Sequence, residues 1–362
     1  MLYKIFYPMA EHFQAFNLLR YITFRSAGAI LTSLIISFIA MPFLIRYLRK
    51  KFNKGQPIRD DGPQQHLAKQ GTPTMGGIVI IFSVISSCLL WGDLSNNYLW
   101  ITMFVTLGCA GLGFADDYLK VSKYNTKGVP GRLKMVYQII IAVIAGIWIQ
   151  NIAPAAYNSH IALPFLKDFL LNLGWFYIPF ITIVLVGASN AVNLTDGLDG
   201  LAIMPIIIAA GCFALIAYLT GSSKFADYLQ LQFVENSAEL AVFCGAMIGA
   251  GLGFLWYNAQ PAEIMMGDVG SLACGGAIGI VSVIVKHEVT LAIIGGLFVI
   301  EALSVIIQVY YFRFTKGKRF FKMAPLHHHF EKCGWSESKV VARFWIIAVI
   351  FAIIGLSTLK IR

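Results

Sequence analysis

The chain has 362 residues, of which 58% are hydrophobic and only 13% are charged. This balance excludes an ordinary soluble domain and is typical of a polytopic membrane protein. The formal net charge of +10 could suggest nucleic-acid binding, but the basic residues flank apolar segments and no RNA- or DNA-binding motif is present, so no nucleic acid is expected as a partner. The six cysteines form no CxxC pair or disulfide framework.

Ten mainly apolar stretches follow residues 1–21, which are expected to lie along the outer membrane interface. Since a transmembrane helix needs about 20 mostly apolar residues, the stretches predict an all-α integral membrane protein, a bundle of about ten transmembrane helices in one domain, 1–362. They cover residues 22–46, 76–92, 98–115, 134–150, 173–189, 200–220, 239–256, 270–285, 290–312 and 340–359.

Lysine and arginine set the expected orientation, because they resist translocation across the membrane. The loops after the first and third stretches and before the last stretch are rich in both residues, whereas the alternate loops carry at most one each, namely Lys167, Lys224 and Lys286. The basic loops are therefore predicted to be cytoplasmic, with both termini on the periplasmic or outer side.

Nearly every unusual motif lies in a segment on this predicted cytoplasmic face, and these segments are expected to form an active site. They are 46–76, 116–134, 187–200, 257–270 and 313–339. Carboxylates at a membrane edge are costly and are functional candidates by default. Five of them stand here: Asp116, Asp117, Asp196, Asp199 and Asp268.

The first segment, around Lys69 and Thr74, is dense in glycine and proline and leads into a helix. The free amides and positive dipole end of such a helix can receive phosphate. The alternative is plain loop punctuation before a helix.

The neighbouring carboxylates Asp116 and Asp117 end the third stretch. Adjacent residues on a helix point about 100° apart, so the two acids are expected to have different roles. One could hold or deprotonate an incoming phosphate while the other assists a cation or a lysine. The alternative is an interfacial acidic pair balanced by Lys120 and Lys123.

Asn193, Asp196 and Asp199 follow one another at three-residue steps after the fifth stretch. If they are helical, they fall within one third of the helix circumference and converge on one cavity, where magnesium or sugar hydroxyls would satisfy them. The alternative for Asp199 is a cap of the next helix.

Asn258 follows the seventh stretch, and Asp268 stands between two glycines at the start of the eighth. An aspartate placed there is a flexible oxygen ligand that suits Mg²⁺, and a plain helix cap is the alternative. In the ninth stretch, Glu301 and Gln308 are seven residues apart and share a helix face.

Three consecutive histidines, His327, His328 and His329, stand in the last basic loop. They cannot easily all face one tetrahedral metal, so zinc is not favoured. Hydrogen bonds from the imidazoles to phosphate or sugar oxygens fit better, and a solvated polar turn is the alternative.

Five ordered motifs together resemble one family, the polyprenyl-phosphate N-acetylhexosamine-1-phosphate transferases. They are Thr72-Pro73-Thr74-Met75-Gly76-Gly77, Phe114-Ala115-Asp116-Asp117, Asn193-Leu194-Thr195-Asp196-Gly197-Leu198-Asp199-Gly200, Gly267-Asp268-Val269-Gly270-Ser271 and Pro325-Leu326-His327-His328-His329-Phe330-Glu331. The resemblance spans nearly the whole chain. The Pro-Leu-His-His-His run, the length and the ten-helix layout are similar to the family's bacterial cell-wall branch.

This resemblance implies an enzyme of the bacterial cytoplasmic (inner) membrane with its active site facing the cytoplasm. It would transfer phospho-MurNAc-pentapeptide from UDP-MurNAc-pentapeptide to undecaprenyl phosphate with Mg²⁺. The products would be UMP and lipid I, in the first membrane step of peptidoglycan synthesis. The resemblance leaves a homodimer open as the oligomeric state.

The resemblance also implies roles for single residues. Asp268 would be the principal Mg²⁺ ligand, Asp116 would engage or deprotonate the lipid phosphate, and Asp117 would support the metal and lysine network. The remaining positions are Lys69, Thr74, Lys120 and Lys134 near phosphates, Asn193, Asp196, Asp199, Asn258 and Gln308 at the nucleotide, and His327, His328 and His329 on the sugar side. Met265 stands where many members have an aromatic that can stack on uracil, and its thioether can still pack on a ring face.

Two other functions remain open. A transferase for UDP-GlcNAc would use the same chemistry, although the triple histidine argues against it. An ion-coupled transporter would also carry intramembrane carboxylates, but it should place them near the midplane of broken helices and show repeated halves. Here the acids cluster at one face without a repeat.

Overall fold

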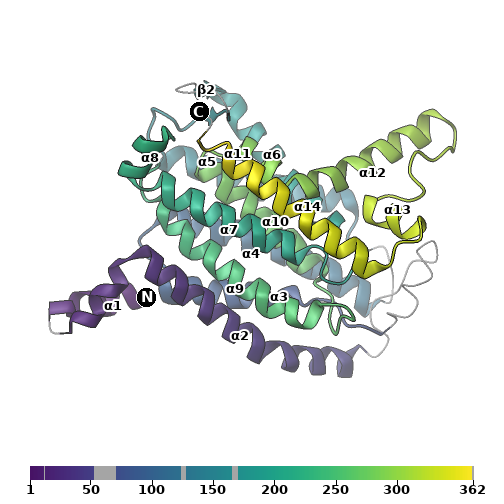
Figure 1. Cartoon of the computed structure of the whole chain (residues 1–362), viewed down its shortest axis with the longest axis horizontal. Helices are drawn as coiled ribbons and strands as arrows, with labels where there is room; N and C mark the ends of the chain where they lie inside the picture. Colours follow the sequence, from purple (N-terminus) through teal and green to yellow (C-terminus); the bar gives the residue numbers. More distant parts are fainter. Residues whose placement is uncertain (12, 53–70, 124–127, 165–169, 361–362) are drawn as a thin grey trace.

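The computed structural model describes residues 1–11, 13–52, 71–123, 128–164 and 170–360. Within these ranges the chain is almost entirely helical, as predicted (Figure 1). The long helices are α2 (Ile22–Lys51), α4 (Asn97–Ser122), α5 (Gly131–Ile152), α6 (Tyr177–Thr195), α7 (Ile203–Thr220), α9 (Leu240–Asn258), α10 (Gly267–Ile284), α12 (Gly296–Phe314) and α14 (Glu337–Ser357).

Shorter elements connect or precede these helices. They are α1 (Leu2–Phe6), α3 (Gly77–Trp91), α8 (Ser223–Leu229), α11 (Glu288–Ile294), α13 (Leu326–Lys332), 3₁₀ helices at Tyr7–Glu11, Gln14–Arg20, Gly174–Phe176 and Ser237–Glu239, and the antiparallel strands β1 (His160–Ala162) and β2 (Leu170–Asn172).

In the described part of the chain, nine helices are long and apolar enough to cross a membrane, and α3 is a shorter apolar helix of 15 residues. Together they correspond to the ten predicted stretches. A helix of this length rises about 22 Å, less than the hydrocarbon core of about 30 Å. Residues 73–76, which precede α3, are buried, so non-helical backbone at that depth is covered by protein, as the membrane requires.

Four predicted boundaries are wrong, one of them the end of the fifth stretch, which continues to Thr195 instead of ending at residue 189. The first stretch continues to Lys51 and the third to Ser122, so Asp116 and Asp117 lie inside α4 and not at its end. The final turns of α4 are polar, but an ion pair between Asp116 and Lys120 spans them and favours helix. The ninth stretch is two helices, α11 and α12, which meet at Gly295.

The core is centred on α9 and α10. Helix α10 packs against α4 and α6, while α9 packs against α2 and α7. Glycines allow these close approaches. At Gly113 in α4, the Cβ of any other residue would collide with the backbone of Asp268 in α10. This contact fixes the start of α10 against the last turns of α4.

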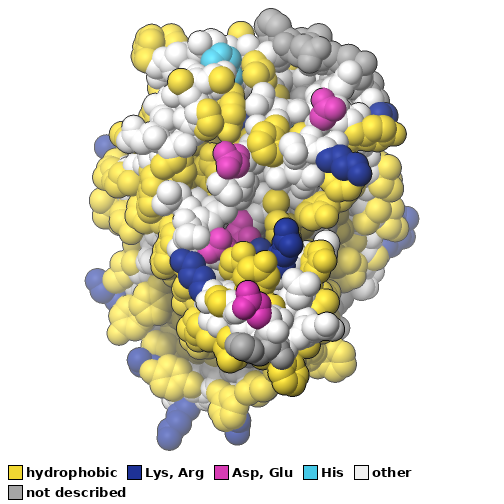
Figure 2. All heavy atoms as spheres, turned by 90° about the vertical axis from the view of Figure 1, so that its left-hand side faces the viewer, with side chains coloured by type: hydrophobic (Ala, Val, Ile, Leu, Met, Phe, Trp, Pro, Cys, Tyr) yellow, Lys and Arg dark blue, Asp and Glu magenta, His cyan; other side chains and the backbone are white. Residues whose placement is uncertain are grey.

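Both termini lie at the end of the bundle opposite α13 (Figure 1). Figure 2 looks onto that end, where acidic side chains lie in a hollow near the centre of the face, beside basic side chains. A buried ion pair joins α2 to the segment before α9: Arg25 Nη2 donates to Glu239 Oε2 at 2.8 Å, and Nη1 contacts Oε1. The pair fastens α2 to the core.

Candidate active site

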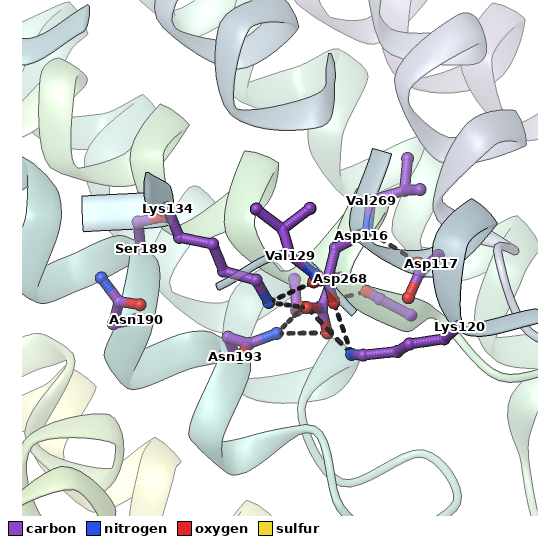
Figure 3. Close-up of polar contacts among 12 residues, drawn as sticks. Asp116, Asp117, Lys120, Val129, Lys134, Ser189, Asn190, Asn193, Asp268 and Val269 are labelled. Carbon is purple, nitrogen blue, oxygen red and sulfur yellow. Dashed lines mark hydrogen bonds and ion pairs between the residues drawn. The ribbon is translucent and has the colours of Figure 1, made fainter. Parts of the chain in front are cut away.

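Three carboxylates from two helices meet at the other end of the bundle (Figure 3). Asp116 and Asp117 come from α4, and Asp268 comes from the first turn of α10. Each offers an oxygen that lies within 4.8 Å of the others. Asp116 and Asp117 are buried, and the Asp268 side chain is 14% exposed. We call these residues the carboxylate cluster.

Two lysines bind the cluster from opposite sides (Figure 3). Lys134 Nζ, from α5, lies 2.8 Å from Asp116 Oδ1 and 2.8 Å from Asp268 Oδ2. Lys120 Nζ, one turn beyond Asp116, lies 2.5 Å from Asp116 Oδ2 and 3.2 Å from Asp268 Oδ2. The backbone N–H of Val129 also donates to Asp116 Oδ1 at 2.7 Å. Each oxygen of Asp116 therefore contacts one ammonium group, and its carboxylate holds the two lysines in place.

Asp117 points to a different set of partners, as the spacing of adjacent helix residues predicts. Its Oδ2 accepts a hydrogen bond from Val269 N–H at 3.1 Å, at the start of α10. Its Oδ1 is buried and has no hydrogen-bond partner among the described residues, and the same holds for the hydroxyl of Thr74. Gly267, at φ +74°, separates these two groups, and a Cβ there would meet both of them. Only glycine fits this backbone conformation and this space.

Helix α6 also contributes polar contacts to the cluster. Asn193 Nδ2 donates to Asp268 Oδ1 at 3.0 Å and lies 2.8 Å from Ser271 Oγ. Deeper in the bundle the polar contacts continue, with Asn190 Nδ2 donating to Gln138 Oε1 and Gln138 Nε2 donating to Ser189 Oγ. Gln138 and Ser189 were missed in the sequence, although Gln138 stands one helical turn after Lys134 and a buried polar residue in a membrane helix is itself a signal.

Backbone pairing joins the segment before α3 to the segment before α10. Met265 N–H donates to Pro73 O at 2.8 Å, and the N–H groups of Gly76 and Gly77 donate to Met265 O and Met266 O, each at 2.9 Å. Thr74 is thereby placed beside the cluster. Lys69, which was expected to act near phosphates with Thr74, lies outside the described residues.

Helix α6 ends at Thr195, so Asn193, Asp196 and Asp199 do not follow one helical face as expected. Asp196 is half-buried just beyond the helix end. Burial and, to a smaller extent, the negative charge of Asp268 raise its pKa to about 7. Asp196 therefore interacts electrostatically with Asp268 of the carboxylate cluster.

Asp199 and Asn258 hold the neighbouring turns together. Asp199 Oδ2 accepts from Ala262 N–H at 3.0 Å. Asn258 Oδ1 accepts from Gly200 N–H at 3.0 Å, and its Nδ2 donates to Ile264 O at 2.9 Å. Both side chains form hydrogen bonds with backbone groups in this structure. Asp199 and Asn258 therefore stabilise the loop between α9 and α10.

The histidines begin α13 and face different partners. His327 is buried, and its Nδ1 lies 3.2 Å from Oε2 of the buried Glu301 in α12, while its Nε2 packs against Gly197. His328 Nδ1 lies 2.7 Å from Glu331 Oε2. His329 Nδ1 accepts from Lys322 N–H at 3.1 Å. The carboxylate of Glu301 thus anchors α13 to α12 and orients His327.

Gln308 lies farther along α12 and fixes the following loop. Its Oε1 accepts from the N–H groups of Phe320 and Phe321, at 3.2 and 2.9 Å. Glu301 and Gln308 share a helix face as expected, and each binds the backbone of the segment that leads to or begins α13.

The donor set of the carboxylate cluster fits a hard divalent cation. Carboxylate oxygens are the ligands that Mg²⁺ prefers, and the buried Oδ1 of Asp117 has no protein donor among the described residues. With all five groups ionised, the three acids and two lysines sum to a formal charge of −1, which favours a cation. Asp116, Asp117 and Asp268 could together hold such an ion.

An apolar groove of about 470 Å³ runs along α6, α10 and the α11–α12 junction. Its walls include Ala191 and Val192, directly before Asn193, and Gly275, two turns after Asp268. Glu288 is among its lining residues at the start of α11. The groove therefore runs along α6 and α10, the two helices that also carry Asn193 and Asp268.

Comparisons with known proteins agree with this geometry. Residues 99–286 match the family model described as glycosyl transferase family 4, and residues 69–81 match phospho-N-acetylmuramoyl-pentapeptide-transferase signature 1. The phospho-N-acetylmuramoyl-pentapeptide-transferase of Granulibacter bethesdensis is 59% identical over 363 residues and covers all of both chains. The chain belongs to this transferase family.

Membership in the transferase family makes the chain an enzyme and confirms the resemblance read from its motifs. The first matched signature contains Thr74, and the larger match contains all three members of the carboxylate cluster. Multiple apolar helices and this family fit a multi-pass protein of the bacterial inner membrane.

Proposed function

We propose that the chain transfers phospho-MurNAc-pentapeptide from UDP-MurNAc-pentapeptide to undecaprenyl phosphate in the presence of Mg²⁺, releasing UMP and forming lipid I. The observation that carries this proposal is the carboxylate cluster with Lys120 and Lys134, in a bundle whose helices α6 and α10 also line an apolar groove. A lipid phosphate and a water-soluble nucleotide have to meet at such a boundary.

Phosphoryl transfer needs positioning and charge neutralisation more than covalent chemistry from the protein. Both substrates are anionic, so their repulsion must be offset at the point of contact. Asp268, Asp117 and Asp116 would hold Mg²⁺, which neutralises charge on the pyrophosphate when it is bound. The same residues leave Lys120 and Lys134 within reach of the reacting phosphates.

The lysines give positive charge that does not depend on the cation. Asp116 contacts both ammonium groups and keeps them beside Asp268. We assign to Asp116 the task of positioning these lysines around the lipid phosphate. A phosphate monoester has a second pKa of about 6 and is already largely ionised at neutral pH, so a general base is not required.

The groove supports undecaprenyl phosphate as the lipid substrate. Its lining is almost entirely apolar, with small residues such as Gly187, Ala188 and Ala191 on α6. A polyprenyl chain lying along α6 and α10 would bring its phosphate to Asn193 and the cluster.

We further propose that the cluster faces the cytoplasm, with both termini on the outer side of the membrane. The whole chain, 1–362, would be one catalytic domain. Its active site would be built from segments 46–76, 116–134, 187–200, 257–270 and 313–339. The basic loops at the same end as the cluster support this orientation. Thr74 would lie near the phosphates. The residues around the nucleotide and sugar would be Asn193, Asp196, Asp199, Asn258, Met265, Gln308 and the three histidines.

The decisive experiment supplies purified protein with undecaprenyl phosphate, Mg²⁺ and either UDP-MurNAc-pentapeptide or UDP-GlcNAc, and measures release of UMP. We expect release only with UDP-MurNAc-pentapeptide. Release only from UDP-GlcNAc would replace the proposed substrate, and no release from either would remove the proposed reaction.

A further inference from the structure

A second pocket lies on α12, separate from the carboxylate cluster. Its volume is about 330 Å³, within the range of roughly 300–1,000 Å³ that is usual for small-ligand sites. Val305, Val309 and Met323 form apolar walls, and the guanidinium groups of Arg313 and Arg319 line the same space. None of the roles assigned above uses either arginine.

The pocket has a fixed frame. Gln308, which also lines it, accepts hydrogen bonds from the backbone of Phe320 and Phe321 and so holds the loop after α12 against the helix. Lys322 N–H donates to His329 Nδ1, which ties the same loop to α13. The pocket is therefore bounded by a helix on one side and by a loop with three backbone anchors on the other.

The charges of the pocket are unbalanced. Among the described residues, no carboxylate lies within ion-pair distance of Arg313 or Arg319. Arg319 Nη1 donates a hydrogen bond to the backbone oxygen of Lys322 at 3.3 Å. Arginine presents planar donors that match a carboxylate in a bidentate manner. Apolar walls with two such groups fit a short peptide that has small side chains and a free carboxylate.

The pocket is connected to the reaction site through α13. Ala324 is part of its lining and is followed by Pro325 and α13. His327 in the first turn of α13 packs against Gly197, which directly follows Asp196. A ligand that spans from the cluster across α13 would reach the pocket with its far end.

We propose that this pocket binds the peptide part of the UDP-sugar substrate and that Arg313 and Arg319 hold a carboxylate of that peptide. The proposal rests on the proposed function, which supplies a substrate with a peptide attached to the sugar. Such a peptide is joined to the sugar at its amino end and therefore ends in a free carboxylate. The pocket would distinguish substrates by their peptide, at a distance from the transferred phosphate.

The test measures dissociation constants of two ligands, UDP-MurNAc-pentapeptide and UDP-MurNAc without a peptide, for the full chain in nanodiscs of neutral lipid with Mg²⁺. Arg319→Ala and Arg313→Ala are compared with Lys318→Ala, which removes a cation from the same loop but does not line the pocket. We expect each arginine variant to weaken binding of the peptide ligand about tenfold, since it removes a charge-assisted hydrogen bond that is partly exposed to solvent. Binding of UDP-MurNAc should change less than twofold.

Three results would overturn the proposal. Equal weakening of both ligands would place the guanidinium groups at the nucleotide or sugar, and unchanged binding of both would remove them from substrate recognition. A loss that appears only in nanodiscs with anionic lipid would assign the pocket to lipid headgroups. Failure of the proposed function is distinguishable, because the unsubstituted protein would then bind neither ligand.

Discussion

Replacing Asp268 by asparagine removes the charge that joins both lysines to the start of α10. Its Oδ2 lies 3.2 Å from Lys120 Nζ and 2.8 Å from Lys134 Nζ, while Oδ1 accepts from Asn193. Asparagine keeps one acceptor oxygen for Asn193 but presents an amide to the lysines. The formal charge of the three acids and two lysines together rises from −1 to zero, which weakens binding of a divalent cation.

The magnitude follows from the two lost contacts. Hydrogen bonds between charged groups contribute about 1.5–3 kcal/mol each, so two of them at about 2 kcal/mol sum to about 4 kcal/mol. A loss of this size in the transition state lowers turnover about a thousandfold, since about 1.4 kcal/mol corresponds to a factor of ten. Higher Mg²⁺ should not restore the rate.

The assay is UMP release over a series of Mg²⁺ concentrations, with a thermal unfolding curve in detergent to show that the Asp268→Asn protein is folded. Asp93→Asn is the matched control, because Asp93 is a partly exposed acid at the opposite end of the bundle. More than a tenth of normal turnover in Asp268→Asn at saturating Mg²⁺ would refute the assignment of Asp268 to the cation and lysine network.

Two further substitutions test the packing around the site and at the opposite end of the bundle. Gly267→Ala should lower turnover at least a hundredfold, because the alanine Cβ would meet a carboxylate oxygen of the cluster at a φ of +74°. Gly317 is the control, since it also has a positive φ, +109°, but has open space around it. Gly317→Ala should have nearly normal turnover in the same UMP assay. Glu239→Gln should lower the unfolding temperature by several degrees, because it leaves the Arg25 guanidinium buried and breaking such a pair costs about 3–5 kcal/mol. Glu235→Gln, an exposed acid nearby, should leave the unfolding temperature unchanged.

Hydropathy was sufficient to locate the membrane helices, because a bilayer demands long apolar segments whatever their neighbours are. It could not locate the polar end of α4. There Lys120 extends the helix through an ion pair with Asp116, which a count of apolar residues does not detect. The break at Gly295 was also missed, since two helices in line have the same composition as one.

The candidate site was predictable as a set of acids, but the partners of each acid were not. Spacing indicated that Asp116 and Asp117 differ, and the structure gives them separate contacts. Asp199 was expected beside Asn193 on one helix face, but α6 ends at Thr195. Whether a helix ends before a Gly-rich turn depends on tertiary contacts, here the backbone bonds made by Asp199 and Asn258.

The residues around Asp268 come from α4, α5, α6 and α10, so they enter the membrane one after another during synthesis. Asp116 and Lys134 can pair as soon as α4 and α5 meet, but the Asp268 carboxylate that contacts both lysines and the Val269 N–H that binds Asp117 arrive only with α10. A nascent chain that stops before α10 carries buried acids and lysines without a complete set of partners. We therefore expect insertion of α10 to be the step at which the N-terminal half of the bundle becomes resistant to membrane quality-control proteases.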